Sequence, residues 1–259
     1  MLSETSVLVQ GVKLHLRRGG SGARVLYLHG PQGMMGAEKA LAALAKTCEV
    51  LAPDHPGFGR SDAPDWLDDV PDLAFFYLDL IEALGLGPVH VVGHSLGGWV
   101  ALEMAVRSTQ RITSLTLASP AGIRVIGVPR ADMFICPPDE LAQLLFAGDG
   151  WQQWNASLTG TPELQDIFDK NRFAAAKMCW QPRLFDPKLE KWLHRIDRPT
   201  RLLWGDADKI IPPAYGARLA ALIPGASLVP VPGVGHLLPV EAPDRFAAET
   251  LRFIAGIAP

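Results

Sequence analysis

Hydrophobic and polar positions alternate only at the start of the chain. Residues Ser6–Gln10 and Val12–Arg17 show a two-residue period on either side of Gly11, which predicts an antiparallel hairpin of two strands. The later apolar runs do not alternate and are rich in Val, Leu and Ile, which is typical of strands buried on both faces of a parallel sheet. These runs are Arg24–Leu28, Glu49–Ala52, Val89–Val92, Ile112–Ala118, Thr200–Trp204 and Ser227–Val231.

Segments with the 3.6-residue period of an amphipathic helix lie between these runs. They are Ala37–Lys46, Leu73–Leu84, Leu96–Arg107, Ala214–Leu222 and Ala242–Ile254. Strand and helix therefore alternate along the chain. This order predicts an α/β fold with a doubly wound, mostly parallel sheet, and right-handed crossovers would place helices on both of its faces.

The alternation stops between residues 123 and 198, where no strand-like run occurs. We expect a core formed by residues 1–122 and 199–259, and a helical cap formed by residues 123–198. Because α/β sheets bind ligands outside the carboxyl ends of their strands, where this insertion leaves the sheet, we interpret the cap as a lid. The alternative is a surface excursion that only packs on the core. The helices expected in the cap are Pro138–Phe146, Trp151–Leu158, Pro162–Cys179 and Pro187–Ile196.

Composition excludes several classes of protein. Of the 259 residues 48% are hydrophobic, which excludes a disordered chain. The 24 basic and 27 acidic side chains nearly balance, so no broad basic surface is expected for nucleic acid or an anionic membrane. Residues 83–102 and 219–240 carry no formal charge, but their glycines and prolines favour buried strands and turns over membrane spans.

The start of the chain and the cysteines indicate the compartment. The first residues lack the basic and apolar regions of a secretion signal, so we expect a cytoplasmic protein. The three cysteines, Cys48, Cys136 and Cys179, lie far apart and fit neither a disulfide framework nor a zinc site. No cluster has the spacing of metal ligands, and we expect no cofactor.

The strongest local signal for chemistry is the segment Val89–Trp99. A predicted strand ends at Gly93, Ser95 occupies the centre of a Gly-x-Ser-x-Gly pattern, and a predicted helix follows at once. The glycines leave room for a sharp turn that exposes the serine hydroxyl. The start of the helix supplies free N–H groups, notably that of Leu96, for a developing oxyanion.

With this turn in place, the sequence resembles the α/β-hydrolase fold family over nearly its whole length. The resemblance implies a nucleophile, an acid and a histidine in that order along the chain. It implies that Ser95 is the nucleophile, that His236 is the base, and that Asp208 orients His236. The motifs that carry it are His29-Gly-Pro-Gln-Gly33, His55-Pro-Gly-Phe-Gly-Arg-Ser-Asp62, the Ser95 turn, and Gly205-Asp-Ala-Asp208 with Gly235-His236.

Two of these positions leave alternatives open. The family pattern of Gly, two residues and Asp selects Asp208 as the acid, but Asp206 lies in the same turn. The family's first oxyanion donor follows His-Gly, and here Pro31 has no N–H to donate. We therefore expect Gln32 to replace it, through either its backbone N–H or its side-chain amide, beside the Leu96 N–H.

The resemblance implies a serine hydrolase that cleaves carboxylic esters. The apolar side chains of the cap indicate a small apolar ester as substrate. No feature predicts an oligomeric state. The residues expected to line the pocket are Trp151, Trp154, Trp180, Phe134 and Met133.

Two other functions remain open. Hydrolases that cleave C–C bonds in ring-fission products of aromatics, and enol-lactonases, are similar to this chain in size, cap and triad. Arg172 or Arg183 could then bind a substrate carboxylate, although the C–C hydrolases usually carry Asn where this chain has His94. The third possibility is a non-catalytic, ligand-binding member of the fold.

Overall fold

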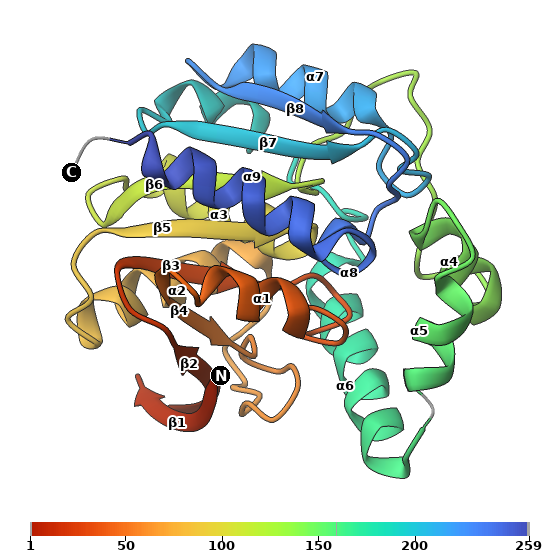
Figure 1. The fold of residues 1–259 in the computed structure, drawn as a ribbon, viewed down its shortest axis with the longest axis horizontal. Helices are drawn as coiled ribbons and strands as arrows, with labels where there is room; N and C mark the ends of the chain where they lie inside the picture. Colours follow the sequence, from red (N-terminus) through yellow and green to blue (C-terminus); the bar gives the residue numbers. More distant parts are fainter. Residues whose placement is uncertain (1, 159, 258–259) are drawn as a thin grey trace.

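The computed structural model describes residues 2–158 and 160–257. A twisted sheet forms the middle layer, and helices cover both of its faces (Figure 1). In the described part of the chain the sheet has eight strands in the order β1-β2-β4-β3-β5-β6-β7-β8. The strands are β1 (Ser3–Val9), β2 (Val12–Gly19), β3 (Ala23–Leu28), β4 (Cys48–Pro53), β5 (Val89–His94), β6 (Ile112–Ala118), β7 (Thr200–Gly205) and β8 (Ser227–Val231).

The pairing of the strands confirms the predicted sheet. Strands β1 and β2 form the antiparallel hairpin, closed by the pair Val9 and Val12, and β2 also runs antiparallel to β4. From β4 to β8 all neighbours are parallel. The carboxyl ends of the parallel strands therefore meet at one edge of the sheet, where α/β proteins place their ligands.

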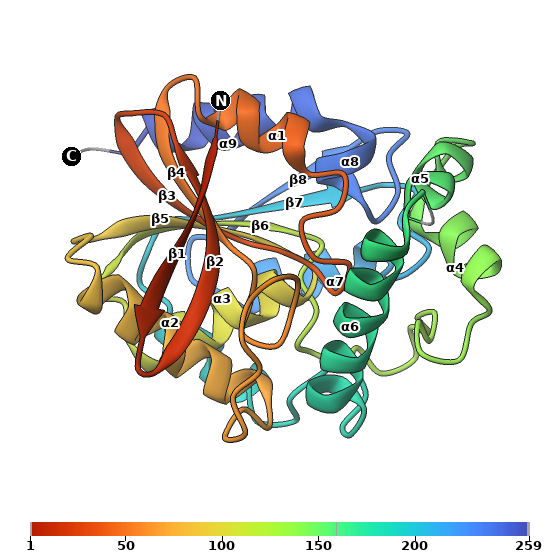
Figure 2. The ribbon, with the colours of Figure 1, turned by 90° about the horizontal axis from the view of Figure 1, so that it is seen from below.

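Helices cover the two faces of the sheet in separate groups. Figure 2 shows α1 (Glu38–Leu44), the short α8 (Leu238–Glu241) and α9 (Pro243–Ala255) on one face. The opposite face carries α2 (Val70–Ala83), α3 (Leu96–Arg107) and α7 (Pro213–Leu222).

Each face has its own hydrophobic core. Val25 and Tyr27 of β3 belong to the core beneath α1 and α9, while Leu26 and Leu28 belong to the core on the opposite face. Successive side chains of a strand point to opposite faces, so a strand covered on both sides must be apolar throughout. This explains the continuous apolar runs in the sequence.

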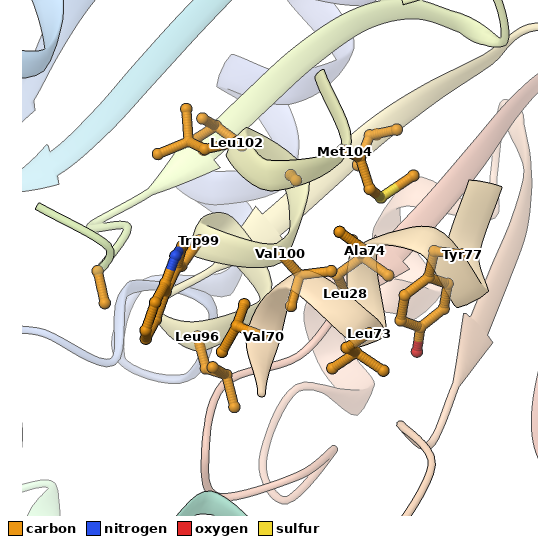
Figure 3. Close-up of a cluster of buried hydrophobic side chains, with 14 of the residues drawn as sticks. Leu28, Val70, Leu73, Ala74, Tyr77, Leu96, Trp99, Val100, Leu102 and Met104 are labelled. Atoms are coloured by element: carbon orange, nitrogen blue, oxygen red, sulfur yellow. The ribbon is translucent and has the colours of Figure 1, made fainter. Parts of the chain in front are cut away.

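Helix α3 is buried on every side, from Leu96 to Val106. It packs between the sheet and α2, so no face of it reaches water. A helix in such a position is expected to be apolar all round. Figure 3 shows the side chains that fill the contact between α2 and α3, among them Val70, Leu73, Ala74, Tyr77, Leu96, Trp99 and Val100.

The segment of residues 123–198 places α4 (Pro138–Leu145), α5 (Trp151–Leu158) and α6 (Pro162–Cys179) beyond the carboxyl ends of the parallel strands (Figures 1 and 2). The expected fourth helix is only a 3-10 helix, Glu190–Arg195, and it packs against α3 and α7 of the sheet layer. No helix in the described part of the chain is both long and apolar enough to cross a membrane.

Candidate active site

Ser95 lies in the sharp turn between β5 and α3. Its backbone has φ 51° and ψ −110°, a conformation that side-chain-bearing residues rarely adopt. Two backbone hydrogen bonds hold the turn: Ser95 N–H donates to Ala118 O (3.0 Å) and Ala121 N–H donates to Ser95 O (3.1 Å). A Cβ at Gly97 would lie 2.0 Å from Leu28 O, so glycine is required for the helix to approach β3 this closely.

The structure brings Ser95, His236 and Asp208 together in one hydrogen-bonded chain, from three separate loops at the carboxyl edge of the sheet. His236 Nδ1–H donates to Asp208 Oδ2 at 2.9 Å. The lone pair on His236 Nε2 then accepts from the Ser95 hydroxyl at 3.0 Å. All three side chains are buried. This arrangement can remove the hydroxyl proton and stabilise the resulting imidazolium.

The two aspartates of the turn after β7 have different partners. The second oxygen of Asp208 accepts from Ile210 N–H (2.9 Å) and Ile211 N–H (2.8 Å), so both oxygens are occupied. Asp206 instead accepts from Gly233 N–H at 2.7 Å. The geometry therefore places Asp208, and not Asp206, beside His236.

His94 precedes the serine but has a different environment from His236. Its Nε2–H donates to the backbone oxygen of His236 at 2.9 Å, which ties the serine turn to the histidine loop. Burial, together with the nearby His236, lowers the pKa of His94 to about 3. His94 is therefore neutral at ordinary pH, and its hydrogen bond joins the serine turn to the histidine loop.

Two further histidines support the loop after β3. His29 Nδ1–H donates to Gly30 O (2.7 Å), and its Nε2 accepts from His55 N–H (2.9 Å). His55 Nε2–H donates to His29 O (3.0 Å), and the Tyr77 hydroxyl donates to His55 Nδ1. Burial lowers the pKa of His29 to about 3 and that of His55 well below its ordinary value. Both rings are thus fixed as neutral tautomers.

The loop after β3 makes a tight turn in which Gly33 N–H donates to Gly30 O at 3.0 Å. Since Pro31 has no N–H and that of Gly33 is used, Gln32 N–H is the remaining donor of the turn. It meets no acceptor in residues 2–158 and 160–257. Gln32 Oε1 is buried near Gly30 and has no hydrogen-bond partner among the described residues. The side-chain amide would donate a hydrogen bond from this position only if its nitrogen and oxygen atoms were exchanged.

A largely apolar cavity of about 40 Å³ lies between this loop and helices α4, α5 and α6. Of the residues predicted to line it, Met133, Phe134 and Trp154 do so, together with Gln32. The sequence does not identify the other residues that line the cavity, because a helical period does not show which face of a helix meets a cavity. Further lining residues include Leu141, Leu145, Phe168 and Arg172.

Two of the predicted pocket residues, Trp180 and Trp151, do not line this cavity. Trp180 follows the end of α6, is 48% exposed, and stacks beneath Arg183 with 4.1 Å between the guanidinium carbon and the ring centre. Trp151 is half-buried and packs against the hydrophobic core, not on the cavity. Both tryptophans lie at helix ends, where the neighbouring loops decide the direction of the side chain.

Two polar residues that the sequence did not single out connect the segment of residues 123–198 to the loops of the candidate site. Glu241 accepts from Gly235 N–H (2.7 Å) and from Ala147 N–H (3.0 Å), and so joins the histidine loop to the segment after α4. Asn171 of α6 bonds Gln32 O and Gly59 N. Side chains that bond distant backbone groups leave no local pattern in a sequence.

The structure also bears on metal and disulfide chemistry. Within the described ranges, no group of three or more His, Cys, Asp or Glu side chains is arranged to hold a metal ion. Cys48, Cys136 and Cys179 are all free thiols.

Comparison with known proteins places this chain in a family. A 2-hydroxy-6-oxo-6-phenylhexa-2,4-dienoate hydrolase of Burkholderia cepacia is 28% identical over 94% of this chain and 92% of its own length. Lipase 3 of a Moraxella species is 25% identical, covering 92% of this chain and 79% of the lipase. The crystal structure of the enol-lactonase from Burkholderia xenovorans LB400 has a TM-score of 0.78 and 25% identity, over 97% of this chain and 100% of that one.

The family model also covers most of the sheet and the candidate site. The model described as the alpha/beta hydrolase family matches residues 25–249, which include the serine turn, the turn after β7 and the histidine loop. On this match, with the α/β sheet that carries the three loops, the chain belongs to the alpha/beta hydrolase family.

Proposed function

We propose that the protein is a serine hydrolase that cleaves carboxylic esters through an acyl-enzyme, with Ser95, His236 and Asp208 as its catalytic triad. The observation that carries the proposal is the continuous hydrogen-bonded chain from the Ser95 hydroxyl through both ring nitrogens of His236 to Asp208. An unactivated serine hydroxyl is a weak nucleophile, and a buried base oriented by a carboxylate removes that limit.

The reaction then proceeds in two halves. Ser95 Oγ attacks the acyl carbon while its proton passes to His236 Nε2, and the N–H groups of Leu96 and Gln32 stabilise the tetrahedral oxyanion. His236 returns the proton to the departing alkoxide, which leaves as an alcohol. A water molecule, deprotonated by His236, attacks the acyl-enzyme and releases the acid with Ser95 regenerated.

The cavity beside the Gln32 loop supports the proposed substrate class. Its lining is mainly apolar, with Met133, Phe134 and Trp154 among the contributors, which favours an apolar acyl or alcohol group. In this proposal residues 123–198 act as a cap that covers the substrate, since α4, α5 and α6 supply most of the lining.

A second candidate function is hydrolysis of a C–C bond or an enol-lactone in a substrate that carries a carboxylate. The observation that favours it is Arg172, which lines the cavity and forms no ion pair within the described residues. Arg183 is less suitable because its guanidinium already pairs with Asp132. The names of the dienoate hydrolase and the enol-lactonase are consistent with this alternative.

The proposal is tested with p-nitrophenyl esters from acetate to laurate and, in parallel, with a ring-fission dienoate. We expect an optimum of ester chain length and no turnover of the dienoate. Ser95→Ala should lower kcat by about 10⁶-fold, because the members of a triad act as a unit. A loss of less than tenfold would exclude Ser95 as the nucleophile.

Other outcomes select the alternatives. Faster turnover of the dienoate, abolished by Arg172→Gln, would identify a C–C hydrolase. A non-catalytic protein would hydrolyse neither substrate and would leave Ser95 unlabelled by a fluorophosphonate, which reacts only with an activated serine.

A further inference from the structure

Asn171 is a fully buried polar residue in α6, the longest helix of the cap segment, and is only 1% exposed. A buried amide must be hydrogen-bonded to avoid a desolvation penalty. Its partners lie outside its own helix: Asn171 Nδ2–H donates to Gln32 O (3.1 Å), and Asn171 Oδ1 accepts from Gly59 N–H (2.7 Å). One side chain of α6 thus joins the loops that follow β3 and β4.

The bond to Gln32 acts on the turn that carries the proposed oxyanion donor. Gly33 N–H and Gln32 O belong to the same peptide group; the first is held by Gly30 O and the second by Asn171. With this peptide held on both sides, the rotation of the Gln32 backbone that would redirect the neighbouring Gln32 N–H is restricted. Asn171 Nδ2 lies 2.5 Å from where a Cβ of Gly33 would be, so only glycine admits the amide there.

The cavity shows why this bond matters for turnover. Its volume of about 40 Å³ is far below the roughly 300–1,000 Å³ of ordinary ligand pockets. Phe168, Arg172 and Ala175 of α6 form part of its wall and α4 and α5 form more of it, so a larger ligand fits only when helices of this segment move. A movement that includes α6 breaks the bond between Asn171 and Gln32, and its return restores that bond.

We propose that Asn171 is a positioning residue that sets the oxyanion loop only when α6 is seated, so that closure of the cap completes the oxyanion hole. This inference rests on the proposed function, in which Gln32 N–H stabilises the oxyanion formed at Ser95. Pro31 makes the dependence on Asn171 strong, because of the two central residues of the turn, Pro31 and Gln32, only Gln32 has an N–H to donate.

Lys170 provides a matched control on the same helix. Lys170 Nζ donates to Gly59 O (2.9 Å) and Ser61 O (2.7 Å), so it also attaches α6 to the core. Among the described residues, neither of these hydrogen bonds goes to the Gln32 loop. Lys170→Met therefore removes two bonds between cap and core while leaving the oxyanion turn in place.

The test compares Asn171→Ala, Asn171→Asp and Lys170→Met with the wild-type protein. The readouts are kcat and KM for a p-nitrophenyl ester, inhibition by a trifluoromethyl ketone that forms a tetrahedral oxyanion adduct, and the rate of Ser95 labelling by a fluorophosphonate. Asn171→Asp is nearly isosteric and still accepts from Gly59 N–H. It places a carboxylate oxygen, which cannot donate a hydrogen bond, against Gln32 O. Thermal unfolding verifies that each variant is folded.

We expect both Asn171 variants to lower kcat and the labelling rate by about 10–100-fold, somewhat less than the loss of a whole oxyanion donor. The affinity for the ketone should fall by the same factor while KM changes little. Lys170→Met should keep the wild-type kcat. Unchanged kcat and ketone affinity in folded Asn171 variants, or an equal loss in Lys170→Met, would overturn the inference.

Failure of the proposed function gives a different result from failure of the role of Asn171. In the first case the wild-type protein hydrolyses no ester and its Ser95 is not labelled at all. A wild-type protein that depends on Ser95 but is indifferent to Asn171 contradicts only the role of Asn171.

Discussion

At the scale of single residues, the turn after β7 separates two aspartates by their partners. Asp208 accepts hydrogen bonds from His236 and from two backbone N–H groups, and its side chain is inaccessible to solvent. Asp206 lies two positions away, is exposed, and accepts from Gly233 in the adjacent loop. Hydrogen bonds to a charged carboxylate are about twice as strong as those between neutral groups, so Asp208 holds the tautomer of His236 firmly.

We predict that Asp208→Asn lowers kcat by about 10⁴-fold with little effect on KM. The amide cannot accept from His236 Nδ1–H with the strength of a carboxylate, and an amide donor turned toward the ring would favour the wrong tautomer. Asp206→Asn is the matched control and should retain the wild-type kcat. Steady-state kinetics of both variants checks this, and equal losses at the two positions would contradict the assignment of Asp208.

At the scale of elements, α3 determines where the serine turn can lie. The helix begins at Leu96 and immediately passes under the end of β3, where Gly97 touches the backbone of Leu28 and His29. The three atoms nearest to a Cβ at Gly97 are backbone atoms, which cannot move aside as the end of a side chain can. Close packing in protein interiors makes such overlap costly.

We predict that Gly97→Ala lowers the free energy of unfolding by about 2–3 kcal/mol, the usual effect of overpacking. For a chain of this size that corresponds to a fall in Tm of roughly 4–12 °C. Gly148→Ala is the control, because a Cβ there meets no atom within 4 Å and the backbone φ is not positive. Differential scanning calorimetry measures both, and a Tm for Gly97→Ala equal to that of Gly148→Ala would contradict the prediction.

At the scale of the whole molecule, stability depends on histidines that are buried without charge. Burial lowers the pKa of His29 and of His94 to about 3 and that of His55 well below the ordinary value. In the unfolded chain each would have a pKa near 6.5. Above about pH 6.5 neither state binds a proton there, and below it only the unfolded state does.

We therefore predict that the free energy of unfolding falls as the pH drops from about 6.5 towards 5. His29 and His94 each contribute a loss of about 2 kcal/mol at pH 5, and His55 adds to the loss in the same direction. Because a whole domain is stable by only about 5–15 kcal/mol, acid unfolding should begin near this pH. Urea unfolding measured at intervals between about pH 8 and 5 gives the slope; a constant free energy over this range would mean that these histidines are protonated in the fold.

The order of elements was predictable from the sequence because it depends on local periodicity. Strands β6 and β8 and helices α3, α5 and α6 have the predicted bounds, and the hairpin and the parallel sheet are confirmed. A strand covered on both faces must be apolar throughout, and a helix on a sheet must be apolar along one side. Only the segment Pro187–Ile196 differs in type from the predicted α-helix. It forms a 3-10 helix, Glu190–Arg195, with two basic residues in its last turn.

The fold and the motif residues could be predicted from the sequence, because short spacings place Ser95 in a turn and Asp208 and His236 after the ends of strands. Which side chains meet depends on the tertiary structure. It set Asp208 against His236, turned Trp180 to solvent, placed Arg172 on the cavity and joined Asn171 to the Gln32 loop. Such contacts join residues more than 100 positions apart in the case of Asn171, and they depend on how packed layers fit together, which no local pattern records.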